Sequence, residues 1–298
     1  MKPFPSIEIV PPLKGITQTE LLDSIRPLME FDPHYINVTC HRDEYEFRQE
    51  ADGSYTRHLL RRRISQTAVC AAVQVAFPHV QVVPHLICAG VSADLLESHL
   101  QDFKFMGIRN ILVLRGDAVP GEKRFTPERD GYAHANELVA AIRRFEAANG
   151  GERYFTLGVG GYPEKHFESP NLETDIRYLK QKVDAGADQI ITQMFFDNAV
   201  FYDFVDRCRA AGITVPIVPG IKPLSSARQV DLLPESFSID IPLELTSEIA
   251  AHPGNAYEIG QEWCKAQCRD LLAHGVGEIH FYTMGRSENI INVLKECF

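Results

Sequence analysis

Residues 185–193, AGADQIITQ, join the end of one predicted helix to the start of one predicted strand. The same joint recurs three times, in MGIRNILVL (106–114), AGITVPIVP (211–219) and HGVGEIHFY (274–282). In each case a glycine follows the helix, where a left-handed residue commonly ends it and the missing Cβ removes the steric cost. These glycines are Gly107, Gly186, Gly212 and Gly275. The repeated joint predicts an α/β protein with alternating helices and strands.

Eight short apolar runs rich in β-branched residues are predicted to be strands, and amphipathic stretches separate them. The runs are residues 6–10, 35–40, 80–88, 111–117, 154–162, 189–196, 215–221 and 278–284. Eight such units without a break in composition predict a single closed (β/α)8 TIM barrel that occupies residues 1–298 as one domain. A doubly wound open sheet is the alternative.

The segment 41–67 interrupts this pattern with a dense mixture of charges around Asp52 and Gly53. We interpret it as a long loop that leads into the second helix, with Asp52-Gly53 as a turn. Its basic run Arg61, Arg62 and Arg63 is expected on a solvated helix face, and attraction of an anionic ligand is the alternative.

Composition excludes several classes of protein. The 30 Lys and Arg against 40 Asp and Glu give a net charge of −10, which argues against a nucleic-acid partner or an anionic membrane surface. No apolar run approaches the ~20 residues of a membrane helix, and the opening MKPFPSIEIVPP has no signal-peptide core, so a cytoplasmic protein is expected. The 7 cysteines form no CxxC pair, which favours reduced thiols over disulfides or a metal site.

Polar residues gather near the carboxyl end of every predicted strand. In an α/β barrel these ends meet at one mouth, where the chemistry of this fold takes place. A carboxylate there, such as Glu8, is expected to have a raised pKa through desolvation, which suits a general acid. The residues at the strand ends are Glu8, Thr39, His41, His85, Arg115, Gly116, Asp117, Tyr162, His166, Gln193, Asp197, Gly220, Lys222, Tyr282, Thr283 and Arg286.

Each of these residues also has an ordinary structural interpretation. Glu8 could be a solvent-facing charge on an edge strand, and His85 could be a hydrogen-bonded core histidine. Asp117 could cap the next turn, and Gln193 could be an amide satisfied inside the barrel. Their joint placement at the strand ends favours the functional interpretation.

Several common chemistries lack their motifs. The chain has no GxxxxGK[ST] P-loop, no HExxH zinc motif and no GxSxG elbow, and GVGGYP at 158–163 lacks the spacing of a GxGxxG turn. The residue types alone predict a barrel enzyme with one acid near the start, an aspartate after the fourth strand, and Lys and Arg groups suited to phosphates. They leave the reaction open.

A series of motifs in fixed order resembles the methylenetetrahydrofolate reductase family over nearly the whole chain. LRGD, YPEKH and KVDAGAD followed by TQMFFD are the most specific of them. The matching pieces are SIEIVPP (6–12), NVT (37–39), PHL (84–86), LRGD (114–117), YPEKH (162–166), LKQKVDAGADQIITQMFFD (179–197), PGIKP (219–223) and HFYTMGR (280–286).

The resemblance implies a homo-oligomeric barrel enzyme that binds FAD noncovalently. NADH or NADPH reduces the flavin and leaves, and 5,10-methylenetetrahydrofolate then accepts the hydride to become 5-methyltetrahydrofolate for methionine synthesis. Glu8 matches the family's general acid, which protonates a poorly basic nitrogen as the folate ring opens to an iminium. Asp117 matches an aspartate near the flavin and the pterin, whose negative charge favours the cationic iminium.

The resemblance also assigns binding residues by motif position. Taken alone, Lys182 would be a helix-surface lysine, whereas the motif makes it a source of positive charge for the FAD diphosphate. The implied folate contacts are Gln193, Gln229 and Arg286. The implied FAD contacts are Thr39, His85, Arg115, Gly116, Asp117, Tyr132, Ala133, Tyr162, His166, Asp175 and Lys182.

The chain departs from the family pattern in several places. Ile87 stands where related sequences often have Thr, which removes a hydroxyl from the mouth, and Leu232 or Leu233 stands where relatives can have an aromatic residue for stacking. The segment 41–67 does not follow the bacterial pattern, so no contact is transferred to it. Because the sequence stops at Phe298 without the eukaryotic regulatory region, control by S-adenosylmethionine is not expected.

Two other functions remain open from the sequence. A proline-dehydrogenase-like flavin oxidoreductase would keep the barrel and the flavin and oxidise another substrate. A noncatalytic subunit would use the barrel only for assembly with a partner.

Overall fold

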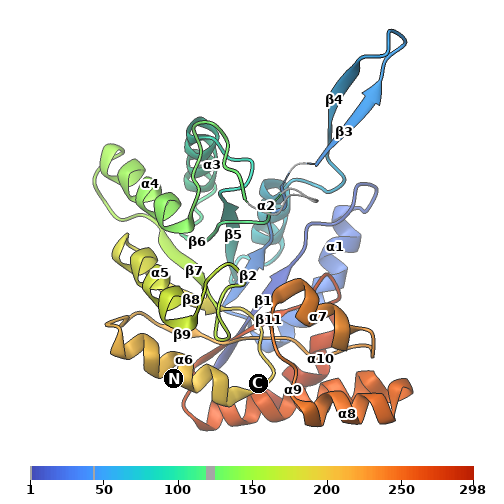
Figure 1. Cartoon of the computed structure of the whole chain (residues 1–298). Helices are drawn as coiled ribbons and strands as arrows, with labels where there is room; N and C mark the ends of the chain where they lie inside the picture. Colours follow the sequence, from blue (N-terminus) through green and yellow to red (C-terminus); the bar gives the residue numbers. More distant parts are fainter. Residues whose placement is uncertain (1, 43, 119–124) are drawn as a thin grey trace.

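The computed structural model describes residues 2–42, 44–118 and 125–298 (Figure 1). Its centre is a parallel sheet with the strand order β10-β11-β1-β2-β5-β6-β7-β8-β9. The strands are β1 Phe4–Ile9, β2 Tyr35–Val38, β5 Gln81–Ile87, β6 Asn110–Leu114, β7 Thr156–Gly161, β8 Gln189–Thr192, β9 Ile217–Val218, β10 Gly220–Ile221 and β11 Glu278–Tyr282.

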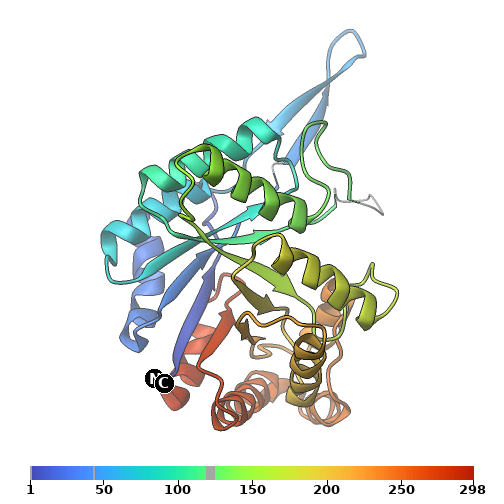
Figure 2. The ribbon, with the colours of Figure 1, turned by 90° about the vertical axis from the view of Figure 1, so that its left-hand side faces the viewer.

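The chain itself joins the two ends of this sheet. β9 pairs with β8 and β10 pairs with β11, and Pro219 alone separates β9 from β10. The His280 amide donates to the Pro219 carbonyl oxygen over 2.9 Å, and the Gly220 amide donates to the Thr192 hydroxyl over 2.9 Å. β9 and β10 thus form one strand interrupted at a proline, which has no N–H to donate. Figure 2 shows the resulting barrel. The predicted (β/α)8 fold is confirmed, and the open-sheet alternative is wrong.

Helices cover the outside of the barrel (Figures 1 and 2). The four glycines at the helix-to-strand joints have the predicted left-handed backbone, with φ values of 75° at Gly107, 116° at Gly186, 78° at Gly212 and 82° at Gly275. The helices are α1 Gln18–Ile25, α2 Gln66–Ala76, α3 Ala93–Phe105, α4 Ala135–Ala148, α5 Leu172–Asp184, α6 Asn198–Ala210, α7 Gln229–Phe237, α8 Leu243–Ala251, α9 Ala256–Ala273 and α10 Glu288–Cys297, with short 3-10 turns at Arg26–Phe31 and Pro253–Asn255.

Side chains along each strand alternate between the helix layer and the barrel interior, because a strand has a period of two residues. Ile7 and Phe281, for example, are buried in the main core between the barrel and the helices. A smaller interior cluster is formed by Val83, Leu112, Ile191 and Val218. Nearer the carboxyl ends of the strands, interior positions carry polar groups, and this is where the candidate site begins.

The segment 41–67 contains a β-hairpin, so its interpretation as a long loop was wrong. β3 (Glu44–Gln49) pairs antiparallel with β4 (Tyr55–Leu60) and projects from the barrel (Figure 1). Tyr45 and Phe47 alternate with charged residues before the Asp-Gly turn, which is a hairpin pattern. They are 45% and 67% exposed, so this strand does not pack on a core. The turn itself is confirmed, with Gly53 at a φ of 83°.

The basic run lies between β4 and α2 and not on a helix face, which corrects the second expectation for this segment. Arg62 pairs with Glu44 at 3.0 Å, and Arg63 donates to the Pro11 carbonyl oxygen over 2.7 Å. The first contact joins the two ends of the hairpin, and the second attaches them to the start of the chain.

Within the described residues, no helix has the length and apolar content needed to cross a membrane. The same part of the chain contains no group of three or more His, Cys, Asp or Glu side chains arranged to hold a metal ion. All seven cysteines are thiols, as the sequence predicts.

Candidate active site

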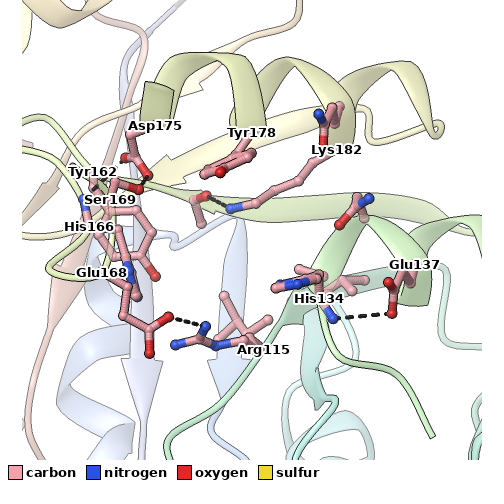
Figure 3. Close-up of a pocket in the computed structure, with 16 residues that line it drawn as sticks. Arg115, His134, Glu137, Tyr162, His166, Glu168, Ser169, Asp175, Tyr178 and Lys182 are labelled. Carbon is pink, nitrogen blue, oxygen red and sulfur yellow. Dashed lines mark hydrogen bonds and ion pairs between the residues drawn. The ribbon is translucent and has the colours of Figure 1, made fainter. Parts of the chain in front are cut away.

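A cavity of about 490 Å³ opens at the carboxyl ends of β6 and β7 (Figure 3). The first turn of α4, one face of α5 and the loop between β7 and α5 complete its walls. It brings together the predicted cofactor contacts Arg115, Tyr162, His166, Asp175 and Lys182. The full lining is Val113, Leu114, Arg115, His134, Ala135, Asn136, Glu137, Gly160, Tyr162, His166, Glu168, Ser169, Asp175, Tyr178, Gln181 and Lys182.

Arg115 follows β6 and forms an ion pair across the cavity with Glu168 (Figure 3). This contact lowers the pKa of the Glu168 carboxyl below its usual range. The next residue, Gly116, has a φ of 79°, and a Cβ there would lie 3.0 Å from the Ala89 Cβ and 3.2 Å from the Ile87 Cβ. The LRGD turn therefore needs glycine for both its backbone conformation and its packing.

Asp175, in the first turn of α5, holds the loop that follows YPEKH. Its carboxylate accepts from the Ser169 hydroxyl over 2.7 Å and from the His166 amide over 3.2 Å. Burial and, next, the Arg115 charge lower the pKa of His166. The imidazole is therefore favoured in its neutral form.

Lys182 lies two turns after Asp175 on the same face of α5, and Tyr178 lies between them (Figure 3). The Lys182 ammonium donates to the Gly160 carbonyl oxygen over 2.8 Å. Burial lowers the pKa of this group to about 8. Arginine and lysine cations form strong, charge-assisted hydrogen bonds to phosphates. Arg115 and Lys182 therefore give the cavity the chemistry of an anion site.

Tyr162 directly follows β7 and lines the cavity. Burial raises its pKa to about 12, and its ring meets that of His166 edge to face at 4.8 Å between centroids. It is therefore a neutral hydrogen-bonding group with an aromatic surface.

Glu8 is buried on β1, opposite Tyr282 of β11 and Asn37 of β2 in the strand registers. Burial raises its pKa to about 8, so the carboxyl carries a proton at neutral pH. The Thr283 hydroxyl donates to the Glu8 carbonyl oxygen over 2.8 Å and fixes the backbone there. The interpretation of Glu8 as an edge-strand charge was wrong, since β1 lies between two strands.

His85 and Asn37 are buried on the adjacent strands β5 and β2, where Asn37 aligns with Val83, two residues before His85. Burial, assisted by His280 and His41, lowers the pKa of His85 to about 3, so the ring is neutral. The His85 Nε2 and the Asn37 Oδ1 have no hydrogen-bond partner within the described residues. Buried polar atoms are normally paired, which makes these two atoms suited to a ligand. The hydroxyl of Thr39, just after β2, lies 3.1 Å from the His41 Nε2.

The predicted folate contacts lie outside the cavity lining. The Gln193 side-chain oxygen accepts from the Met194 amide over 2.9 Å. The Gln229 side-chain oxygen accepts from the Lys222 ammonium over 3.2 Å and from the Ser225 amide over 2.8 Å. Arg286 is exposed in the turn after β11. Of the two leucines after Gln229, Leu232 is 37% exposed and Leu233 is 4% exposed, in a second apolar cluster.

Six of the predicted FAD contacts do not line the cavity, namely Thr39, His85, Gly116, Asp117, Tyr132 and Ala133. Asp117 is exposed and lies near His41 and Tyr162. Burial lowers the pKa of His41 and the Asp117 charge opposes that shift, whereas burial raises the pKa of Tyr162 and the Asp117 charge adds to it. Tyr132 packs against the core. The Ala133 amide donates to the Glu137 carboxylate over 2.8 Å.

Sequence reasoning missed several lining residues, above all Glu168, Ser169, Tyr178, Gln181 and His134. A usable signal existed for two of them. Tyr178 is three residues after Asp175 and Gln181 is six after it, which places both near one helix face. Glu168, Ser169 and His134 come from irregular segments, where no periodicity indicates which side chains face inward.

The family model described as methylenetetrahydrofolate reductase matches residues 1–297. The 5,10-methylenetetrahydrofolate reductase of Escherichia coli is 32% identical over 286 residues, which is 95% of this chain and 86% of the relative.

Two eukaryotic relatives are longer. Methylenetetrahydrofolate reductase (NADH) 1 of Arabidopsis thaliana is 32% identical over 97% of this chain, and the probable methylenetetrahydrofolate reductase (NADPH) of Caenorhabditis elegans is 33% identical over 98%. The chain covers 47% and 42% of their respective lengths, so it spans about half of each. By the match along its whole length, the chain belongs to the methylenetetrahydrofolate reductase family.

Proposed function

We propose that the protein reduces 5,10-methylenetetrahydrofolate to 5-methyltetrahydrofolate with NADH or NADPH, through noncovalently bound FAD, and so supplies methyl groups for methionine synthesis. Residues 1–298 act as one catalytic domain in this proposal. The family match along residues 1–297 supports the reaction class. The observation that carries the chemistry is Glu8, a buried carboxyl that holds its proton at neutral pH in the barrel mouth.

The residues present fit FAD. The cavity provides two cations, Arg115 and Lys182, for a diphosphate and a volume of about 490 Å³, within the usual range of ligand pockets. The unpaired His85 Nε2 and Asn37 Oδ1 lie in the barrel interior, where the polar edge of a flavin ring would satisfy them. When bound, FAD accepts a hydride from the nicotinamide and passes it to the folate.

Glu8 would donate its proton to the folate nitrogen that leaves as the imidazolidine ring opens. A carboxyl with a pKa of about 8 is mostly protonated at pH 7, whereas an ordinary glutamic acid is not. Asp117 would have a different role from the proton donor Glu8. Its exposed carboxylate at the mouth would stabilise the positive charge of the iminium. Gln193, Gln229 and Arg286 would bind the folate, with Gln193 at the pterin and Arg286 at the glutamate tail.

The test is an anaerobic half-reaction experiment on the purified protein with both nicotinamides. The visible flavin spectrum should bleach with NADH or NADPH and return when methylenetetrahydrofolate is added. A colourless protein that takes up no added FAD would overturn the proposal. Bleaching by proline in place of a nicotinamide would indicate the proline-dehydrogenase-like alternative.

Glu8→Gln separates the two half-reactions. The variant should keep flavin reduction by NAD(P)H, which needs no proton from Glu8, and lose roughly 100-fold or more of the folate half-reaction. Equal losses in both halves would contradict the assigned role. A variant that still supports growth without methionine, while surface substitutions abolish it, would indicate a noncatalytic subunit.

The proposal also includes a cytoplasmic location, where both nicotinamides are available, and a homo-oligomeric assembly. Light scattering on the protein as it elutes from a size-exclusion column measures the mass of the assembly directly. A monomeric mass would contradict the proposed homo-oligomer but would not affect the proposed reaction.

A further inference from the structure

Three cysteines meet where α9 packs against α10, in a part of the molecule that contributes nothing to the cavity lining (Figure 1). Cys264 and Cys268 lie one turn apart on α9, and Cys297 is the last residue of α10. Glu296, next to Cys297, pairs with Lys265 at 3.3 Å and with Arg269, and these two cations flank Cys268 on α9. Burial, and after it the two neighbouring thiols, raise the pKa of Cys268. We define the three cysteines as the thiol cluster.

The three thiols of the cluster differ in their exposure to solvent. Cys264 is 1% exposed and Cys268 is 0% exposed, while Cys297 is partly exposed. A small reagent from solvent therefore reaches Cys297 first. A second thiol, Cys268, is buried beside it, since Arg269 pairs with Glu296.

The surroundings of Cys297 favour its thiolate. The neighbouring Cys268 thiol is the main cause of a lowered pKa at Cys297. Burial and the charge of Glu296 oppose this shift, and Arg269 and Lys265 support it. Both cations are held at this end of α10 by ion pairs with Glu296.

Other cysteines of the chain are in the opposite situation. Burial raises the pKa of Cys70, Cys88 and Cys208 to about 12 in each case. Since the thiolate is the reactive form of cysteine, these three thiols are inert, whereas Cys297 is poised to react.

We propose that Cys297 and Cys268 form a peroxide-oxidisable dithiol that closes to a disulfide between α10 and α9. The Cys297 thiolate attacks one oxygen of a hydroperoxide, the O–O bond breaks, and a sulfenic acid and one hydroxide, or alkoxide, result. The Cys268 sulfur then attacks the sulfenic sulfur, the S–O bond breaks, and water leaves with the Cys268 proton. With hydrogen peroxide the sum is two thiols and one peroxide giving one disulfide and two waters.

Cys268, and not Cys264, is the partner in this reaction. The pKa of Cys297 is affected by the Cys268 thiol, which is therefore its nearest reaction partner. A bond between Cys264 and Cys268 is disfavoured, because these two residues lie one turn apart on a single helix, whose backbone resists the short Cβ separation of a disulfide. The bond would link α9 to the helix that follows the Arg286 turn.

Peptide mapping tests the proposal without any flavin, so its result is independent of the proposed function. The fully reduced protein is treated with hydrogen peroxide, blocked with N-ethylmaleimide and digested with trypsin. Trypsin cuts after Arg228, Lys265, Arg269 and Lys295, so Cys264, Cys268 and Cys297 fall on three different peptides, 229–265, 266–269 and the peptide that begins at Glu296. The expected product joins the second and third peptides, with the loss of two hydrogens, and dithiothreitol reverses it.

Variants sharpen the result. Cys264→Ser should leave the link intact, and Cys297→Ser should abolish it. Cys268→Ser should drive Cys297 to the sulfinic acid, because no thiol remains to trap the sulfenic acid. The proposal is overturned if Cys297 of the wild-type protein stays fully alkylated, or if the link joins 229–265 to either other peptide. The wild-type map decides even if a variant fails to fold.

Discussion

The ammonium of Lys182 donates a hydrogen bond to the carbonyl oxygen of Gly160 over 2.8 Å and so connects helix α5 to the end of strand β7. The contact holds a buried cation at the wall of the cavity. Burial lowers its pKa to about 8, so the charge of Lys182 changes in an accessible pH range.

Lys182→Met should weaken FAD binding roughly 10- to 100-fold, the effect of one hydrogen bond to a charged group. In the wild type, affinity should fall as the pH rises through about 8, because the cationic form binds the diphosphate. The variant should lose this dependence. Flavin fluorescence titrations at several pH values measure both effects. Lys180→Met, which removes the partly buried partner of Asp184 on the same helix, is the matched control.

Glu168→Gln should tighten FAD binding by a few-fold, roughly 1 kcal/mol or less. Glu168 occupies Arg115 in the free protein, and its negative charge repels a diphosphate. The same titration tests this, with Glu173→Gln as control because Glu173 pairs with Arg207 away from the cavity. Weaker binding in the Glu168 variant would mean that the carboxylate supports the site.

Glu8→Gln should make the folded protein more stable at alkaline pH. The pKa of Glu8 is raised by burial from 4.5 to about 8, so between these values the folded state keeps a proton that the unfolded state has released. Wild-type stability therefore falls as the pH rises through this window, and glutamine is free of that loss. Urea unfolding should show a difference on the order of 5 kcal/mol above pH 8 that vanishes near pH 4. A constant difference at every pH would contradict the assignment.

Gly116→Ala should destabilise the protein more than Gly107→Ala. Both glycines have a left-handed backbone, with φ of 79° and 75°, but only at Gly116 would a Cβ meet close neighbours. Gly107→Ala should cost roughly 1 to 2 kcal/mol for the backbone conformation. Gly116→Ala should cost roughly 1 to 3 kcal/mol more for overpacking. Urea unfolding of the two variants isolates the packing contribution, and equal losses would rule it out.

Replacing residues 45–59 of the hairpin with a short Gly-Ser turn should leave the barrel stable to within about 1 kcal/mol. β3 and β4 pair mainly with each other, and Tyr45, Phe47, Tyr55 and Leu59 are all at least 45% exposed. Surface segments of this kind contribute little to unfolding free energy. Thermal unfolding of the shortened protein measures the change, and a large loss would show that the hairpin packs on the barrel.

Much of the fold could be predicted from local patterns. The glycine joints and the eight apolar runs are short-range features, and the barrel follows because each strand must pack between helices and an interior layer. The hairpin at 44–60 was missed because both of its faces are exposed to solvent. Its sequence therefore lacks the apolar face by which a buried strand is normally identified. The seventh predicted strand is split at Pro219 into β9 and β10. This split depends on how the barrel closes, because β9 pairs with β8 and β10 pairs with β11.

The sequence by itself determined the alternation of strands and helices and the family, because these depend on residue types and local spacing. Only the tertiary structure decided that Glu8 holds its proton, that Arg115 is paired with Glu168, and that Cys268 lies near Cys297. Burial and pairing arise from segments far apart in the chain, 53 residues apart for Arg115 and Glu168. The charge state of a group depends on its surroundings in space, and those exist only once the barrel has closed.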